Sequence, residues 1–286
     1  MEETKVDQEE FRAGQRRDWN QASEGWREWS DFIDRWTTPV SERLTAMARL
    51  EPGQRVLDVA AGYGEPSLTA ARIVGPQGSV VATDISPGML AYGRERAAGT
   101  GMQNVEFIEA DAASLDFAAG SFDAALSRWG IIFEPDAEGA AGRIREFLRP
   151  GGRMAISSWG PPERVPFMAV PMVTLRKVLD VPPPPPGVPG PLSRPTRDAI
   201  AGLLEGGGFS GVEVEELEIT FEYDSPEAFA SSVRGIVAPI ANLVKAQPPE
   251  VQDQVWQAIA DAAAMHAGDD GTVRFTNLVL VAAGQA

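Results

Sequence analysis

The chain has 286 residues, enough for one domain with insertions or for two small domains. Its 43% of hydrophobic residues suffices for a core, and its formal net charge of −16 argues against nucleic-acid binding, which requires a basic surface. It has no cysteine and one histidine, so neither disulfides, thiolate chemistry nor a dedicated metal site is expected.

The first residues, Met1 to Lys5, have neither the basic start nor the apolar stretch of a secretory signal. No apolar run approaches the ~20 residues of a transmembrane helix. We therefore expect a cytoplasmic protein without a membrane span, and we expect its acidity to serve solubility. The sequence leaves the oligomeric state open.

Residues 11–48 are predicted to be helical, with one apolar stripe at spacings of three and four residues. The members of the stripe are Trp19, Ala22, Trp26, Trp29, Ile33 and Trp36. The stripe either packs against an end of a sheet or forms an aromatic lid over a bound ligand. Both interpretations can hold for different members, and residues 1–43 are predicted to form an N-terminal helical lid.

The segment Val56–Gly64 predicts a buried strand followed by a glycine-containing turn. Apolar residues flank Asp58, as in a parallel strand covered on both faces, so this carboxylate should have a fixed hydrogen-bond partner. Gly62 and Gly64 permit positive φ angles and let a ligand approach the backbone. A helix over residues 67–74 would direct its N–H groups at that ligand.

Asp84 ends the next predicted strand, where doubly wound folds place the carboxylate that binds a ribose. NAD-binding folds share this combination, but Ser67 occupies the place of the third glycine of their G-x-G-x-x-G motif. Asp58 would also bring negative charge toward a pyrophosphate, whereas it suits a ligand with an amino group. A dinucleotide is therefore disfavoured.

Strands and helices alternate from Arg55 to Trp159, which predicts an α/β core with a parallel sheet and a ligand at the carboxyl ends of its strands. The expected strands cover residues 55–60, 79–84, 104–108, 121–127 and 153–159. One of the intervening helices is expected around residues 137–148. We assign this core to residues 44–160.

The alternation stops after Trp159. Residues 161–195 contain an apolar, helix-like stretch from Phe167 to Leu179 and a proline run at 182–186, which suits a stiff polyproline II spacer. We interpret this region as a proline-rich lid insertion, because the proline run lies inside a domain; a partner-docking motif is the alternative.

The remainder of the core is assigned to residues 196–286. It begins with a predicted helix at 196–206 and an edge strand near 212–219, and it ends with a strand from Val273 to Ala282. A helical insertion over 225–267 precedes the last strand, where it would form another wall of a pocket.

Five motifs occur in the order and spacing typical of class I S-adenosylmethionine-dependent methyltransferases. They are Asp58-x-Ala60-x-Gly62-x-Gly64, Asp84-Ile85-Ser86-Pro87-Gly88-Met89-Leu90, Glu109-Ala110-Asp111-Ala112, Ser121-Phe122-Asp123-Ala124-Ala125-Leu126-Ser127 and Leu148-Arg149-Pro150-Gly151-Gly152-Arg153. Over roughly residues 50–160 the chain thus resembles this family, especially its small-molecule branch typified by ubiquinone/menaquinone-biosynthesis methyltransferases. Ala60 departs from the pattern, because the family often has glycine there.

The resemblance implies an α/β, Rossmann-like, doubly wound sheet of seven strands in the order 3-2-1-4-5-7-6, with the last strand antiparallel and with helical lid insertions. It also implies S-adenosyl-L-methionine as cofactor. The residues implied to bind it are Asp58, Ala60, Gly62, Gly64, Asp84, Ile85, Met89, Asp111, Ala112, Arg128 and Trp129.

Each implied role belongs to one part of the cofactor. The Gly62–Gly64 turn would hold the methionine moiety, which Asp58 would orient through backbone groups or water. Arg128 and Trp129 would lie beside this end. Asp84 would accept from both ribose hydroxyls. Ile85 and Met89 would enclose the adenine, and Asp111 and the Ala112 N–H would bind its edge. Three of these residues also have a structural interpretation: Asp58 as a cap, Asp84 as a helix N-cap and Met89 as a core residue.

The resemblance further implies attack by a nucleophile on the sulfonium methyl. The residues predicted to line the acceptor pocket are Trp19, Trp26, Phe133, Trp159, Phe167, Met168 and Met172. They suggest a small, largely apolar acceptor, for which we consider aromatic and polyketide-like skeletons. We expect methylation at oxygen or carbon, and the sequence leaves nitrogen open. Two other hypotheses stay open: an NAD-linked oxidoreductase, and a catalytically silent protein that retains S-adenosylmethionine binding.

His266 is the candidate general base, because histidine titrates near neutrality. Its setting, Ala262 to Asp269, instead favours the end of a helix, whose dipole stabilises imidazolium by ~0.3–1 kcal/mol. We expect the helix-end role, with the acceptor proton taken by a carboxylate or water unless the acceptor arrives already acidic.

Overall fold

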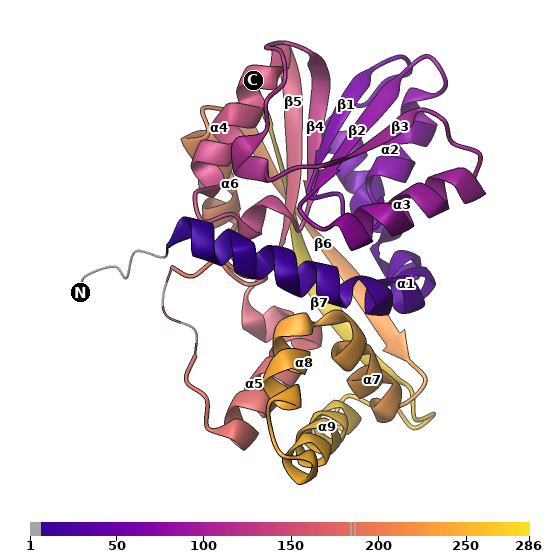
Figure 1. Ribbon diagram of the computed structural model, residues 1–286, viewed down its shortest axis with the longest axis vertical. Helices are drawn as coiled ribbons and strands as arrows, with labels where there is room; N and C mark the ends of the chain where they lie inside the picture. The colour runs from indigo at the N-terminus through magenta and orange to yellow at the C-terminus, as the bar shows by residue number, and fades with distance from the viewer. Residues whose placement is uncertain (1–6, 184, 186) are drawn as a thin grey trace.

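The computed structural model describes residues 7–183, 185 and 187–286. The prediction about the first five residues, and the polyproline conformation at residues 184 and 186, therefore lie outside the described residues. Figure 1 shows a sheet domain above and a group of helices below, with the N-terminal part of helix α1 (Gln8–Met47) running between them.

The core is a seven-stranded sheet in the order β3-β2-β1-β4-β5-β7-β6. Strands β1 to β5 are parallel, and β7 is antiparallel to both β5 and β6. The strands are β1 (Arg55–Val59), β2 (Ser79–Asp84), β3 (Val105–Glu109), β4 (Phe122–Arg128), β5 (Leu148–Trp159), β6 (Ser210–Tyr223) and β7 (Val273–Gln285). This confirms the predicted fold class and strand order.

Helices cover both faces of this sheet, because successive side chains of each strand point to opposite faces. Val56 belongs to the core under α2 (Ser67–Val74) and the C-terminal part of α1, whereas Leu57 and Val59 belong to the core under α4 (Ala137–Phe147) and α6 (Arg197–Gly206). Helix α3 (Pro87–Gly99) packs over β2 and β3. Short 3₁₀ turns follow three of the strands: Ala112–Ser114, Ile131–Phe133 and Pro162–Arg164.

Strand β6 is an edge strand, as predicted, but it is longer than its 212–219 pattern suggested. Its last residues continue to pair with β7 beyond the core, and Phe221 and Tyr223 are buried among the helices there. In Figure 1 both strands extend downward into the helical group. The hairpin therefore connects the sheet domain to this group.

The helical group consists of α5 and three helices of the predicted 225–267 insertion. Helix α9 packs against α5 and α7. The bounds are α5 (Pro166–Leu179), α7 (Pro226–Ile236), α8 (Ala238–Lys245) and α9 (Pro249–Ala264). Nowhere in the part of the chain that the structure describes is a helix long and apolar enough to cross a bilayer.

Helix α1 begins after Asp7, whose carboxylate accepts from the N–H groups of Glu9 and Glu10. It ends at Met47, so the predicted boundary after residue 43 falls inside the helix. Its C-terminal part is buried in the core through Val40 and Leu44. The helix is continuous because the apolar face that enters the core extends to its last turn.

Candidate cofactor and acceptor site

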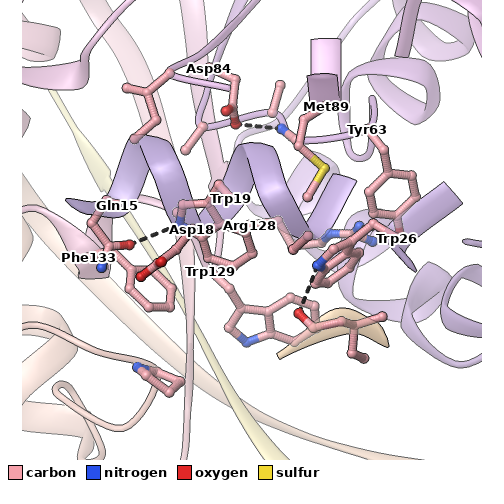
Figure 2. Close-up of a pocket in the computed structure, with 18 of the residues that line it drawn as sticks. Gln15, Asp18, Trp19, Trp26, Tyr63, Asp84, Met89, Arg128, Trp129 and Phe133 are labelled. Carbon is pink, nitrogen blue, oxygen red and sulfur yellow. Dashed lines mark hydrogen bonds between the residues drawn. The ribbon is translucent and has the colours of Figure 1, made fainter. Parts of the chain in front are cut away.

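A cavity of about 270 Å³ lies at the carboxyl ends of the strands, and residues of the sheet, α1 and the helical group line it. Most of the predicted site residues line it, and Figure 2 shows several of them converging. The predicted residues at the cavity are Ala60, Gly62, Asp84, Ile85, Met89, Asp111, Ala112, Arg128, Trp129, Trp19, Trp26, Phe133, Trp159, Phe167 and Met168.

Asp58 does not line the cavity, so the orienting role implied for it would act through backbone groups or water. Its side chain points to the α2 face of the sheet and is completely buried, and one carboxylate oxygen accepts from the Ser67 hydroxyl, which is the fixed partner expected for it. The other oxygen, Oδ1, has no hydrogen-bond partner in the described part of the chain. Burial raises the pKa of Asp58 to about 7.

Gly64, Met172 and His266 also lie outside the residues that line the cavity. Gly64 has a φ of +105°, a left-handed conformation that favours glycine, and a Cβ atom there would lie 3.5 Å from the Cα atom of Gly93 on α3. Met172 lies one helical turn beyond Met168 on α5 and packs against the core beside it. His266 follows the end of α9 and packs on Phe275, with ring centroids 4.9 Å apart.

The turn after β1 presents bare backbone to the cavity. Ala60 has a φ of +57° and Gly62 a φ of +55°. The left-handed conformation at Ala60 explains why glycine suits this position, and it costs alanine about 1–2 kcal/mol. A Cβ atom added at Gly62 would meet no atom within 4 Å, so this backbone faces open space in which a ligand group fits.

Asp84 closes the same turn from the end of β2. Its Oδ2 accepts from the Gly62 N–H at 2.8 Å and its Oδ1 from the Ser86 N–H at 2.8 Å. These bonds fix the carboxylate at the cavity while each oxygen keeps acceptor capacity. Burial raises the pKa of Asp84 to about 6, although the backbone N–H groups oppose this shift.

The far end of the cavity has a charged border that sequence reasoning missed. Arg12 of α1 forms an ion pair with Glu134, and its Nε lies 3.8 Å from Asp111. Asp111 accepts from the Ala113 N–H at 2.9 Å. Arg12 and Gln15 precede Trp19 at spacings of three and four residues, so they lie on the same helix face as the tryptophan stripe. This spacing in the sequence could have indicated that they lie at the cavity.

Arg128 and Tyr63 form the opposite end. Arg128 is buried and donates to the hydroxyls of Thr37, Ser41 and Tyr63 at 3.0–3.1 Å. The Tyr63 hydroxyl in turn donates to Asp34 at 2.7 Å. Tyr63 stands between the two glycines of the turn, so this polar group adjoins the bare backbone of Gly62.

Aromatic rings line the side of the cavity toward β5 and the helical group. Trp129 and Trp159 are stacked, with centroids 4.5 Å apart and planes at 11°, and Trp19 meets Phe133 edge-on at 5.5 Å. The Trp26 indole donates to the Ile236 carbonyl at 3.1 Å, a bond drawn in Figure 2. The lining residues on this side that sequence reasoning missed are Phe221, Ile236, Val237, Ala238, Pro239 and Pro191.

The structure divides the tryptophan stripe between both interpretations. Trp19 and Trp26 line the cavity, whereas Trp29 packs on Phe32 with centroids 5.6 Å apart. Trp36 packs against the core. The stripe therefore combines a cavity wall with ordinary packing.

Comparison with known proteins matches part of the chain to a family. Residues 56–152 match the model of the family described as "Methyltransferase domain". Aklanonic acid methyltransferase DauC from Streptomyces sp. (strain C5) is 40% identical over 121 residues, covering 42% of this chain and 55% of DauC. The ubiquinone/menaquinone biosynthesis C-methyltransferase UbiE from Ectopseudomonas mendocina is 38% identical over 117 residues, covering 41% of this chain and 46% of UbiE.

The chain thus spans about half the length of these curated relatives. Among solved structures, the YcgJ protein from Bacillus subtilis has the same fold, with a TM-score of 0.56 and 17% identity over 86% of this chain and 97% of YcgJ. Residues 56–152 are therefore a methyltransferase domain, and the chain has the sheet and the motifs of a class I S-adenosylmethionine-dependent methyltransferase.

Proposed function

We propose that the protein transfers a methyl group from S-adenosylmethionine to a small, largely apolar acceptor at oxygen or carbon. The observation that carries the proposal is a cavity with two different sides. Gly62 and Asp84 provide backbone and carboxylate on one side, and Trp129, Trp159 and Phe167 provide an apolar wall on another. A nucleoside-bearing cofactor fits the first side and an apolar acceptor fits the second.

The cofactor would extend along the carboxyl ends of β1, β2 and β3. Asp84 would accept from the ribose hydroxyls, because its fixed carboxylate retains free acceptor positions. Asp111 and Ala112 would bind the adenine edge, with Ile85 and Met89 beside the ring. The methionine moiety would then lie at the Gly62 turn, with its sulfonium facing the aromatic wall.

The contribution of the protein to the transfer is geometric. Holding the acceptor atom in line with the departing sulfur lowers the activation free energy by ~7–11 kcal/mol relative to reaction between free molecules. Positive charge leaves sulfur during the step, so an apolar site covered by α1 favours an anionic nucleophile. This cover would come from residues 8–26 of α1, the α7–α8 junction and α5. We propose that the insertions act as lids in this way.

The proton of a hydroxyl acceptor would leave to water or to a cavity carboxylate, because His266 lies away from the cavity. Asp18 is one such carboxylate; it lines the cavity and accepts from the Asn242 amide at 3.2 Å. The names of the relatives refer to an acid acceptor in DauC and to C-methylation in UbiE, which is why we retain both oxygen and carbon.

Two other functions are disfavoured by particular observations. Dinucleotide binding is disfavoured because Ser67 occupies the position of the third glycine of the G-x-G-x-x-G motif. The Ser67 hydroxyl donates to the Asp58 carboxylate under the turn. In this cavity the cofactor residues adjoin an apolar compartment. A catalytically silent protein would not need such a compartment.

Calorimetry tests the cofactor. S-adenosylmethionine and S-adenosylhomocysteine should bind with micromolar affinity and NAD should not bind. Asp84→Ala should weaken S-adenosylhomocysteine binding by about 1.5–3 kcal/mol, as expected for lost bonds to a charged group. The control is Asp116→Ala, an exposed carboxylate on the chain after β3. Unchanged affinity in Asp84→Ala would refute the ribose assignment.

Turnover tests the reaction. Wild-type protein with S-adenosylmethionine should methylate members of a panel of phenols, carboxylic acids and 1,3-dicarbonyl compounds with apolar skeletons. Cofactor binding without turnover on any member of the panel would favour the silent alternative.

A further inference from the structure

Asp18 of α1 differs from the other carboxylates that line the cavity. Among the described residues, these others are Glu65, Asp84, Asp111 and Glu134. Glu65 and Glu134 lie beside arginines, and Asp84 and Asp111 accept from backbone N–H groups of the sheet domain. Asp18 instead faces the helical group, and in the described part of the chain no lysine, arginine or histidine nitrogen lies within 4.0 Å of its carboxylate.

Two amide side chains hold the Asp18 carboxylate in place. Its Oδ1 accepts from the Asn242 amide of α8 at 3.2 Å, and the Asn242 amide oxygen accepts from the Gln21 amide at 2.7 Å. The second carboxylate oxygen, Oδ2, accepts no hydrogen bond from any described residue. A carboxylate fixed through one oxygen can accept from a ligand through the other, and such a bond is stronger than one between neutral groups.

The surroundings of Asp18 within the cavity are apolar. They include Ala22 one turn along α1 and the segment 237–239 at the start of α8. Asp18 and Gln15 also line a second hollow along the first turns of α1, so they mark a border of the cavity. A ligand that reaches this border without a hydrogen-bond donor would displace water from the carboxylate and leave it unpaired, which costs binding free energy.

The position of Asp18 along α1 separates it from the glycine turn. Trp26 of α1 contacts Tyr63 of that turn, with ring centroids 5.4 Å apart. Asp18 precedes Trp26 by eight residues, a rise of about 12 Å along a helix. Figure 2 shows Asp18 and Tyr63 on opposite sides of the view, with Trp19 between them. Of the two roles open to this carboxylate, taking the acceptor proton and anchoring the acceptor, the position favours the second.

We propose that Asp18 is a specificity-determining residue that accepts a hydrogen bond from a hydroxyl group of the acceptor remote from the methylated atom. Asn242 and Gln21 are positioning residues for it. The inference rests on the proposed function, which places the sulfonium at the Gly62 turn. A hydroxyl group suits this apolar compartment better than an ammonium group, because a neutral donor loses less on leaving water. The acceptor is then an elongated, apolar molecule with a nucleophilic atom at one end and a hydroxyl group at the other.

Calorimetry on the complex with S-adenosylhomocysteine tests the proposal with two pairs of ligands of different length. The pairs are 2,6-dihydroxynaphthalene with 2-naphthol, and 4,4′-dihydroxybiphenyl with 4-phenylphenol. The wild-type complex should bind the dihydroxy member of at least one pair about 5- to 50-fold more tightly, as expected for a bond to a charged group. Asp18→Leu should remove this preference and leave the affinity for S-adenosylhomocysteine unchanged.

Two further variants test the positioning residues. Asn242→Leu and Gln21→Leu leave the Asp18 carboxylate in place but remove the amides that hold it, so each should lower the preference by about 2- to 5-fold. Asp31→Leu is the matched control, because it makes the same substitution at an exposed position of the same helix. This variant should retain the wild-type preference.

The proposal would be overturned if the wild-type complex showed no preference for the diols, whether it bound both members of each pair or neither. A preference that survives Asp18→Leu would overturn it too. Equal weakening of both members of a pair would mean that Asp18 only supports the packing of α1 on α8.

Turnover of 4-phenylphenol, which has no remote hydroxyl group, separates anchoring from proton transfer. Its kcat should be unchanged in Asp18→Leu, whereas a fall of ~10²-fold would assign Asp18 to proton transfer and overturn the anchoring role. Failure of the wild type to bind S-adenosylhomocysteine would refute the proposed function itself. That outcome is distinct from a loss of selectivity between the paired ligands.

Discussion

Asp58 shows at the scale of one residue how burial sets a protonation state. It lies inside β1, where one of its oxygens has no hydrogen-bond partner among the described residues, and burial raises its pKa from the ordinary value of 3.8 to about 7. The folded protein therefore holds a proton that the unfolded chain has lost between about pH 4 and pH 7. Since the folded state binds more protons in this window, stability falls as pH rises through it and is constant above it.

Asp58→Asn should therefore be more stable than wild type at pH 8 and nearly equal to it at pH 4. The gain at pH 8 should be on the order of 2–4 kcal/mol, because one pKa unit corresponds to about 1.4 kcal/mol. Urea unfolding at both pH values, without cofactor, measures the difference. A gain that is the same at pH 4 and pH 8 would show that ionisation of Asp58 is not its cause.

Asp84 gives a pH dependence of binding. Burial raises its pKa to about 6, and its ionised form is the better acceptor for ribose hydroxyls. Affinity for S-adenosylhomocysteine should therefore rise as pH increases through about 6 and level off above pH 7. Calorimetry from pH 5 to pH 8 should show the rise in wild type and in Asp58→Asn, and a flat profile in Asp84→Ala. A sloping profile in Asp84→Ala would assign the titration to another group.

His266→Ala should leave kcat within about threefold of wild type with the best acceptor found, since its ring packs on Phe275 outside the cavity. Loss of a general base would lower kcat by ~10²-fold or more. Steady-state kinetics of the variant distinguishes the two results, and a fall of that size would restore His266 as the base.

At the scale of elements, α1 and α7 cross at two glycines. A Cβ atom at Gly25 would lie 2.0 Å from the carbonyl oxygen of Gly235, so the two backbones touch. The next residue on each helix takes part in the bond from the Trp26 indole to the Ile236 carbonyl. The wall of the cavity therefore depends on this crossing.

Gly25→Ala should push the helices apart and destabilise the protein by about 1–3 kcal/mol, as overpacking does. Gly14→Ala is a matched control in the same helix, because its Cβ would meet only the tip of the Arg17 side chain, at 3.8 Å. It should be neutral or stabilising by roughly 0.5–1 kcal/mol. Thermal unfolding of both variants gives the comparison, and equal melting temperatures would contradict the tight crossing.

At the scale of the molecule, ion pairs fasten the N-terminal end of α1 to the sheet domain beside the cavity. Arg12 pairs with Glu134, whose side chain is only 6% exposed. The neighbouring pair, Arg16 with Glu109, is about half exposed, with side chains at 50% and 42%. A half-exposed pair contributes roughly 0–1 kcal/mol, so the first pair should be the effective one.

Arg12→Met should therefore accelerate dissociation of S-adenosylhomocysteine by about 5- to 50-fold, as expected for a lost bond between charged groups. Arg16→Met should change the dissociation rate by less than about threefold. Stopped-flow measurement of tryptophan fluorescence follows both variants. Equal rates in Arg12→Met and wild type would show that this end of α1 does not control release.

The sequence by itself determined the sheet core and the position of the site at the carboxyl ends of its strands. Strand periodicity, the glycine turn and the acids at Asp84 and Asp111 are local patterns, and each sets an element or its end without reference to distant residues. The stripe on α1 was also local, since the spacing of its members defines one helix face. These features therefore agree with the structure.

Only the tertiary structure decided which side chains meet the cavity. The α1 stripe could not show that Trp26 faces it while Trp29 does not, because that division depends on contacts such as Gly25 with Gly235, about 200 positions apart in sequence. Nor could the motif around Asp58 show that its carboxylate points under the turn to Ser67, since this depends on how α2 packs on the sheet. Helix and strand formation follow from neighbours in sequence, whereas the cavity is made by segments that folding brings together.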